Sequence, residues 1–174
     1  MPPLKLSLFL LALLMITPAV STACSPGVII IVSNSVDIEA ARELNKALLK
    51  QGFPCFILRP DELWKVEHYS VDAMIYLGGP KAYEGIGEIV ASYLTDDEEA
   101  SLMEEGAMKI FVKLEDGKKI IILAGNTRNE TREAVTYFFD KLVNVLKVPI
   151  TGGEGANVIM VVVGTQPSST PVGG

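Results

Sequence analysis

The chain has 174 residues, of which 49% are apolar, enough to build one domain with a proper core. Its formal net charge of −6 disfavours phosphate backbones and anionic lipid surfaces as partners. No stripe of basic residues interleaved with aromatics is present, so we exclude nucleic-acid binding.

Residues 1–23 have the pattern of a signal peptide. Lys5 precedes the apolar run Leu6 to Ile16, and small residues follow that suit cleavage after Ala23. The run is shorter than the roughly 20 apolar residues that a membrane span needs, and an uncleaved N-terminal anchor is the alternative. We therefore predict an extracytoplasmic protein, secreted or attached to the cell surface. Behind the signal peptide we expect a single α/β domain over 24–164 and a disordered Pro/Ser/Thr/Gly tail over 165–174.

The two cysteines, Cys24 and Cys55, suit an oxidising compartment. Cys24 precedes the first predicted strand and Cys55 lies near the start of the second, so parallel pairing would bring them to the same end of the sheet. We favour a disulfide between them. Cleavage after Ala23 would also leave Cys24 at the N-terminus, where a lipid is the competing modification and a membrane link.

Hydrophobic periodicity predicts strands that alternate with helices along residues 28–163. Asp37 is the expected cap of the first helix, and capping boxes are expected at Thr95 with Glu98 and at Thr127 with Glu130. The segment 108–114 alternates and predicts an antiparallel strand near an edge, buried on one face. The expected strands are 28–32, 53–58, 71–77, 108–114, 120–123 and 158–163, and the expected helices are 38–50, 61–67, about 87–93, 96–105 and about 127–148.

This order predicts a three-layer α/β sandwich. We expect a mostly parallel, doubly wound sheet of Rossmann-like or flavodoxin-like type, with one antiparallel hairpin around residues 115–118.

Ligands of doubly wound sheets bind at the carboxyl ends of the strands. Three loops are expected there, each with backbone N–H groups or small residues near a helix start, which suits an anion. The alternative is that these residues only make turns and caps. A cavity of roughly 300 Å³ or more would favour binding. The candidate ligand-binding residues are Ser33, Ser35, Gly78, Gly79, Asn126 and Arg128.

No pattern in the sequence demands catalysis, a metal or a cofactor. The single histidine, His68, is expected on the surface away from the crevice, and no nucleophile elbow or phosphate loop is present. The acidic run 96–99 suits the start of a helix better than a calcium site. Asn129 begins a glycosylation sequon with Glu130 and Thr131, a possible modification site.

Two segments carry a resemblance to a known family. Residues 77–90, which contain Gly78-Gly79-Pro80-Lys81-Ala82, and residues 120–135, which contain Ala124-Gly125 followed by Arg128, Thr131 and Ala134, resemble S-layer-related cell-surface domains of archaea. The resemblance covers most of residues 28–146. It implies a non-catalytic envelope module whose partners are other envelope or surface-layer proteins, and it suggests that Arg128 clamps the Gly78-Gly79 turn. The alternatives are an extracytoplasmic small-molecule or anion-binding protein and, less favoured, a secreted hydrolase.

Overall fold

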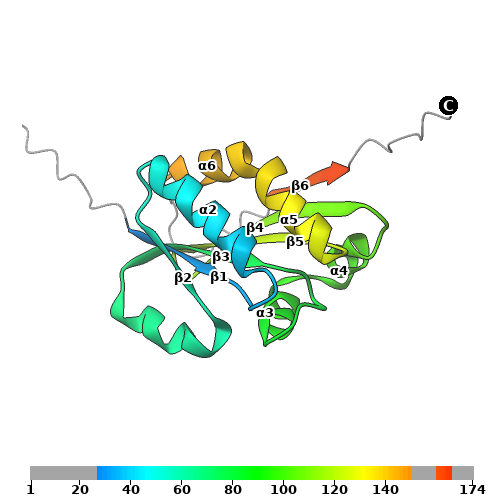
Figure 1. Ribbon diagram of the computed structural model, residues 1–174, viewed down its shortest axis with the longest axis horizontal. Coiled ribbons are helices and arrows are strands. Elements are labelled where there is room, and N and C mark those ends of the chain that lie inside the picture. The colour runs from blue at the N-terminus through cyan, green and yellow to red at the C-terminus, as the bar shows by residue number, and fades with distance from the viewer. Residues whose placement is uncertain (1–26, 150–159, 166–174) are drawn as a thin grey trace, which may run out of the picture.

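The computed structural model describes residues 27–149 and 160–165, and for 160–165 only the backbone. The described residues form the predicted α/β fold, a mostly parallel sheet with helices on both faces (Figure 1). The strands are β1 (Val28–Val32), β2 (Cys55–Leu58), β3 (Val71–Leu77), β4 (Ala107–Glu115), β5 (Lys118–Gly125) and β6 (Met160–Thr165). The helices are α2 (Ile38–Lys50), the 3₁₀ helix η1 (Pro60–His68), α3 (Ile86–Tyr93), α4 (Asp96–Leu102), α5 (Arg128–Tyr137) and α6 (Phe139–Lys147).

The sheet has the strand order β2-β1-β3-β5-β4-β6. Strands β2, β1, β3 and β5 are parallel, and β4 is antiparallel to both of its neighbours. Strand β2 lies on one side of β1 and strand β3 lies on the other. The direction in which strands are added to the sheet therefore reverses between β1 and β3. Such a switch point opens a crevice at the carboxyl ends of the strands.

Each face of the sheet is covered by its own helices (Figure 1). Alternate residues of β1, such as Ile29 and Ile31, pack under α2, α5 and α6. The residues between them, Ile30 and Val32, pack against η1, α3 and α4. Because both faces are buried, the central strands carry continuous apolar runs, which is why their positions were predictable.

Three sequence predictions about the elements need correction. Strand β4 is buried on both faces, since Lys109 on the face that alternation assigned to solvent is only 5% exposed. The expected helix over 127–148 divides at Phe138 into α5 and α6. That division is slight, because Phe138 N–H donates to Ala134 and Leu142 N–H donates to Phe138, as in a continuous helix.

The third correction concerns Asp37, which precedes α2 but does not cap it with its side chain. The capping boxes at Thr95 and Thr127 are confirmed. Residues 1–26, which include the predicted signal peptide and Cys24, and the predicted tail from residue 166 lie outside the described residues.

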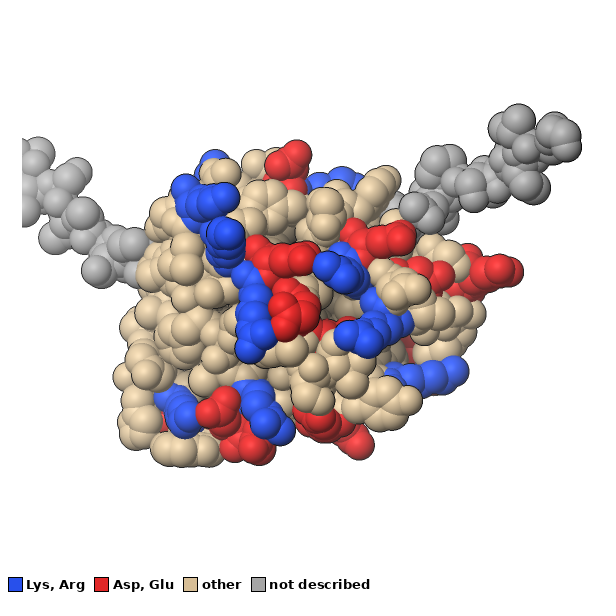
Figure 2. Space-filling model, in the orientation of Figure 1, with Lys and Arg blue, Asp and Glu red and all other residues tan. Residues whose placement is uncertain are grey.

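On the face that carries α2 and α5, acidic and basic side chains are interspersed (Figure 2). Arg132 on α5 pairs with Glu43 on α2 at 2.9 Å, and Arg42 pairs with Glu39 within α2. These exposed pairs add little stability. Because charges of both signs are mixed, this face carries no extended patch of a single charge sign. No helix among the described residues is long and apolar enough to cross a bilayer.

Candidate functional site

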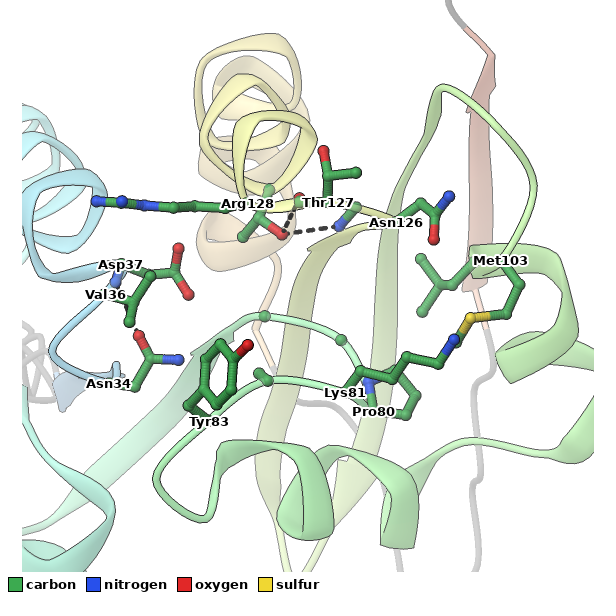
Figure 3. Close-up of a pocket in the computed structure, with 16 residues that line it drawn as sticks. Asn34, Val36, Asp37, Pro80, Lys81, Tyr83, Met103, Asn126, Thr127 and Arg128 are labelled. Carbon is green, nitrogen blue, oxygen red and sulfur yellow. Dashed lines mark hydrogen bonds between the residues drawn. The ribbon is translucent and has the colours of Figure 1, made fainter.

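A crevice of about 310 Å³ opens at the carboxyl ends of β1, β3 and β5, where the topology predicts a site (Figure 3). Three loops build it: the β1–α2 loop, the loop after β3, and the β5–α5 junction. The lining residues are Asn34, Val36, Asp37, Gly78, Gly79, Pro80, Lys81, Ala82, Tyr83, Leu102, Met103, Gly125, Asn126, Thr127, Arg128 and Thr131.

Asn34 lies at the floor of the crevice and is only 1% exposed. Its Oδ1 accepts a hydrogen bond of 2.7 Å from the backbone N–H of Asp37. That bond fixes the orientation of the amide, because only the oxygen can accept from an N–H group. The other amide atom, Nδ2, is buried and makes no hydrogen bond with any described residue. Figure 3 shows it turned toward the crevice and Tyr83.

Asp37 is 8% exposed, and its carboxylate faces the crevice (Figure 3). The Asp37 side chain makes no cap hydrogen bond to α2, in contrast to the capping role that the sequence predicted for it. Burial raises the pKa of this carboxyl, while the Asn34 amide, which lies close to it without forming a hydrogen bond through Nδ2, and the Arg128 guanidinium act in the opposite direction. Asp37 is therefore a buried hydrogen-bond acceptor that is incompletely neutralised.

The loop after β3 depends on Gly78. Its φ of 125° lies in a region that favours glycine, and a Cβ there would stand 2.8 Å from the Cβ of Ala82. The Gly78 N–H donates to Leu123 of β5 at 3.0 Å, which holds the turn against the sheet. The backbone can therefore pass close to Asp37, whose Oδ2 would lie 3.9 Å from such a Cβ.

The β5–α5 junction forms the opposite wall. Gly125 lets α5 approach the sheet, because a Cβ there would stand 2.4 Å from the Cβ of Glu130. The buried Thr131 hydroxyl accepts from Gly125 N–H and donates to the carbonyl of Thr127, both at 3.1 Å (Figure 3). This close packing sets Asn126 and Arg128 at the rim.

Glu84 ties two of the three loops together. Its carboxylate accepts hydrogen bonds from the backbone N–H and from the hydroxyl of Ser35, and these bonds lower the pKa of Glu84. Glu84 itself has a φ of 57°, which is uncommon for a residue with a side chain. The preceding residue, Tyr83, is 70% exposed and stands over the crevice with its ring beside the floor (Figure 3).

Four of the six predicted ligand-binding residues line the crevice: Gly78, Gly79, Asn126 and Arg128. Two do not. Ser33 is fully buried and its hydroxyl donates to the carbonyl of Asn34, whereas Ser35 is bound to Glu84. No hydrogen bond among the described residues joins Arg128 to the Gly78-Gly79 turn, and in Figure 3 its side chain runs over Asp37 toward α2.

Three residues that line the crevice were not among the predicted ligand-binding residues: Asn34, Asp37 and Tyr83. The first two belong to a run of short polar residues after β1, any of which can close a turn or cap a helix. The usable signal was that this run offers more polar side chains than a turn and a cap require.

Of the residues that the predicted disulfide and glycosylation would modify, the structure describes Cys55 and Asn129, and both lie outside the crevice. Cys55 is half-buried, forms no disulfide with any described residue, and has its Sγ 3.5 Å from the carbonyl of Asn45. Burial raises its pKa to about 11. Its proposed disulfide partner, Cys24, lies outside the described residues, so that bond stays a prediction. Asn129 is exposed, but Thr131 of the same sequon is 3% exposed and hydrogen-bonded within α5.

His68 lies away from the crevice, at the end of η1 and just before β3 begins, where it packs edge-on against Trp64. Within residues 27–149, no three His, Cys, Asp or Glu side chains gather in a way that could hold a metal ion. In the acidic run of α4, Glu98 caps the helix and pairs with Lys113 at 2.7 Å.

Comparisons with known proteins show no family. No family model matches the chain, and no curated protein matches it. Among solved structures, CpGH84D has a TM-score of 0.41 and 11% identity, and the alignment covers 63% of this chain and 16% of that one. A GH138 enzyme targeting pectin rhamnogalacturonan II has a TM-score of 0.38 and 14% identity, and the alignment covers 76% of this chain and 15% of that one. Likenesses this weak carry no argument about function.

Proposed function

We propose that this chain is an exported, non-catalytic cell-surface module that binds a small molecule in the crevice at the carboxyl ends of β1, β3 and β5. The observation that carries the binding role is Asn34 Nδ2, a buried donor without a hydrogen-bond partner among the described residues, at the floor of a cavity of about 310 Å³. An unsatisfied buried donor costs about 1–3 kcal/mol. A ligand acceptor in the crevice would remove that cost.

The size of the crevice supports a small ligand. Ligand sites commonly measure roughly 300–1,000 Å³, so this one stands at the small end. Half of its lining residues are glycine or apolar, and the polar groups of Asn34 and Asp37 lie at the floor. This combination is typical of specific binding.

The lining residues favour binding over catalysis. Asp37 is the one carboxylate among them, and no serine, cysteine or histidine joins it. Acid–base hydrolysis commonly needs a second carboxylate, and a catalytic triad needs a histidine. The hydrolase alternative therefore gains no support from these side chains.

The surface role rests on the sequence: the signal-peptide pattern, the acidic composition and the resemblance to S-layer-related domains. On this proposal the partners are other envelope proteins, and a lipid or disulfide at Cys24 decides whether the module is anchored. Mass spectrometry of the protein recovered from the cells that make it tests export. We expect an extracytoplasmic protein that begins at Cys24. A cytosolic protein that retains residues 1–23 would refute this part.

Binding is tested by blocking the mouth of the crevice. Asn126 lines the rim and its side chain is exposed, so Asn126→Trp is expected to close the crevice without entering the core. Asn144→Trp places the same side chain on an exposed position of α6, outside the crevice. A panel of small neutral and charged compounds is screened against each protein by ligand-observed NMR.

Compounds that bind the wild type and Asn144→Trp, but not Asn126→Trp, would support the proposal. If no compound distinguishes the two tryptophan variants, the crevice is not a binding site.

A further inference from the structure

The floor of the crevice presents one hydrogen-bond donor beside one acceptor. Asn34 Nδ2 is held in place because Oδ1 of the same amide is engaged by Asp37 N–H at 2.7 Å. The acceptor is the carboxylate of Asp37, which points into the same space (Figure 3). A ligand that only donates or only accepts would leave one of these buried groups unsatisfied.

The charges around this floor are of both signs. The carboxylate of Asp37 lies at the floor, and Arg128, whose charge acts on Asp37, lines the crevice together with Lys81. A neutral ligand can occupy this space without adding a charge that the crevice must balance.

The rim suits a ligand that also has an apolar face. Tyr83 is 70% exposed, with its ring beside the crevice, and Met103 and Pro80 line the same opening (Figure 3). An aromatic ring with a polar tip packs against C–H groups while its hydroxyl stays in water.

We propose that the crevice binds a neutral, hydroxyl-rich molecule of one ring, such as a monosaccharide, through a pair of neighbouring hydroxyl groups. A hydroxyl both donates and accepts, so one can donate to Asp37 while its neighbour accepts from Asn34 Nδ2. The C–H face of the ring then packs against Tyr83. This inference rests on the proposed binding function and names the class of ligand.

The test uses defined probes. Glucose, galactose and mannose represent the neutral class, glucuronate is the matched anion, glucosamine is the matched cation, and N-methylacetamide is a neutral amide that also offers one donor and one acceptor. Affinities are measured by NMR titration of the folded protein. We expect at least one of the three neutral sugars to bind more tightly than the other three probes.

Two nearly isosteric variants then test the floor. Asn34→Asp replaces the donor with an acceptor but keeps the oxygen that receives Asp37 N–H. We expect it to weaken sugar binding about tenfold or more, as loss of one buried hydrogen bond does. Asn144→Asp is the control, because Asn144 is exposed on α6, outside the crevice. If Asn34→Asp fails to fold, Asp37→Asn tests the acceptor side, because a neutral amide oxygen accepts more weakly than a carboxylate.

The outcomes separate this inference from the binding function. If none of the three sugars binds, or if glucuronate, glucosamine or the amide binds more tightly, the inference is wrong while the crevice still binds small molecules. Sugar binding that Asn34→Asp and Asp37→Asn leave unchanged would also overturn it. Failure of the Asn126→Trp comparison would instead remove the binding function itself.

Discussion

The two ends of strand β5 bury polar groups in opposite ways. At its amino end, Lys119 is 8% exposed, and its Nζ donates to the carbonyls of Val145, Leu146 and Val148 at the end of α6. Those carbonyls have no partner within the helix, so the lysine closes it. At the carboxyl end, the crevice holds Asn34 with an unused donor and Asp37 with a poorly neutralised carboxylate. The lysine makes its hydrogen bonds within the protein, whereas the Asn34 donor has no partner among the described residues and lies at a crevice that a ligand could enter.

The largest loss of stability is expected from a change at the carboxyl end of β5, where the crevice lies. Gly125→Ala would place a Cβ 2.4 Å from the Cβ of Glu130 and push α5 away from the sheet. We expect a loss of about 3 kcal/mol in the free energy of unfolding, at the upper end for overpacking. Gly79→Ala is the control, because its Cβ would meet only ordinary contacts, the nearest at 3.6 Å. Urea denaturation of both variants checks this, and equal losses would contradict it.

At the amino end, removing the satisfied polar group should also be costly. Lys119→Met keeps the length of the side chain but leaves three carbonyls without their donor. We expect a loss of about 1–2 kcal/mol, because Val145 and Leu146 are partly buried while Val148 is exposed. The measurement is again the free energy of unfolding in urea. A variant as stable as the wild type would show that water replaces the lysine, and the contrast between the two ends would disappear.

The ion pair of Glu98 and Lys113 is a second case of polar groups that are satisfied within the protein, and its loss should cost less stability. The two side chains are 12% and 17% exposed and lie 2.7 Å apart. Burial raises the pKa of Glu98, but the bonds from Lys113 and Thr95 outweigh it, and the net pKa is below the usual 4.5. Glu98→Gln is expected to cost about 1 kcal/mol at neutral pH. Because the folded pKa is depressed, this contribution is present above pH 4.5 and is lost as pH falls through the folded pKa. Denaturation curves at pH 7 and pH 3 check this, and a gap that persists at pH 3 would contradict it.

Much of the fold was predictable from local signals. The continuous apolar runs of β1 and β3 predict strands buried on both faces, and the capping boxes at Thr95 and Thr127 mark two helix starts within one residue. Strand β4 was misjudged because Lys109 has a polar tip on a long apolar stem that can be buried. Alternation of residue types cannot distinguish such a lysine from one in solvent.

The site was less predictable than the fold. Topology located the crevice, and the glycines of two loops identified its walls. The floor depended on how the short polar side chains after β1 are used, and that follows from the backbone path of this loop. Asn34 closes the turn by accepting from Asp37 N–H, and the Asp37 side chain makes no cap, which leaves it as a candidate ligand contact.

Substitution of Asp37 is expected to give the smallest change in stability. Unlike the other substitutions, it should stabilise the protein at neutral pH. Burial raises its folded pKa above the unfolded value of 3.8, so the native state binds the proton more tightly. Its contribution to stability is full below pH 3.8 and is lost as pH rises through the folded pKa. Asp37→Asn removes the charge, and the variant should be more stable than the wild type at pH 7 by less than about 1 kcal/mol.

That gain should shrink toward zero near pH 3, where the wild-type carboxyl is protonated. Thermal denaturation of both proteins across this range is the measurement. If Asp37→Asn is less stable than the wild type at pH 7, the carboxylate is well satisfied in the folded protein, and the two ends of β5 are alike. A variant that gains stability and loses sugar affinity would instead mark Asp37 as a group kept for its ligand, because a residue retained for the fold alone would not combine these two effects.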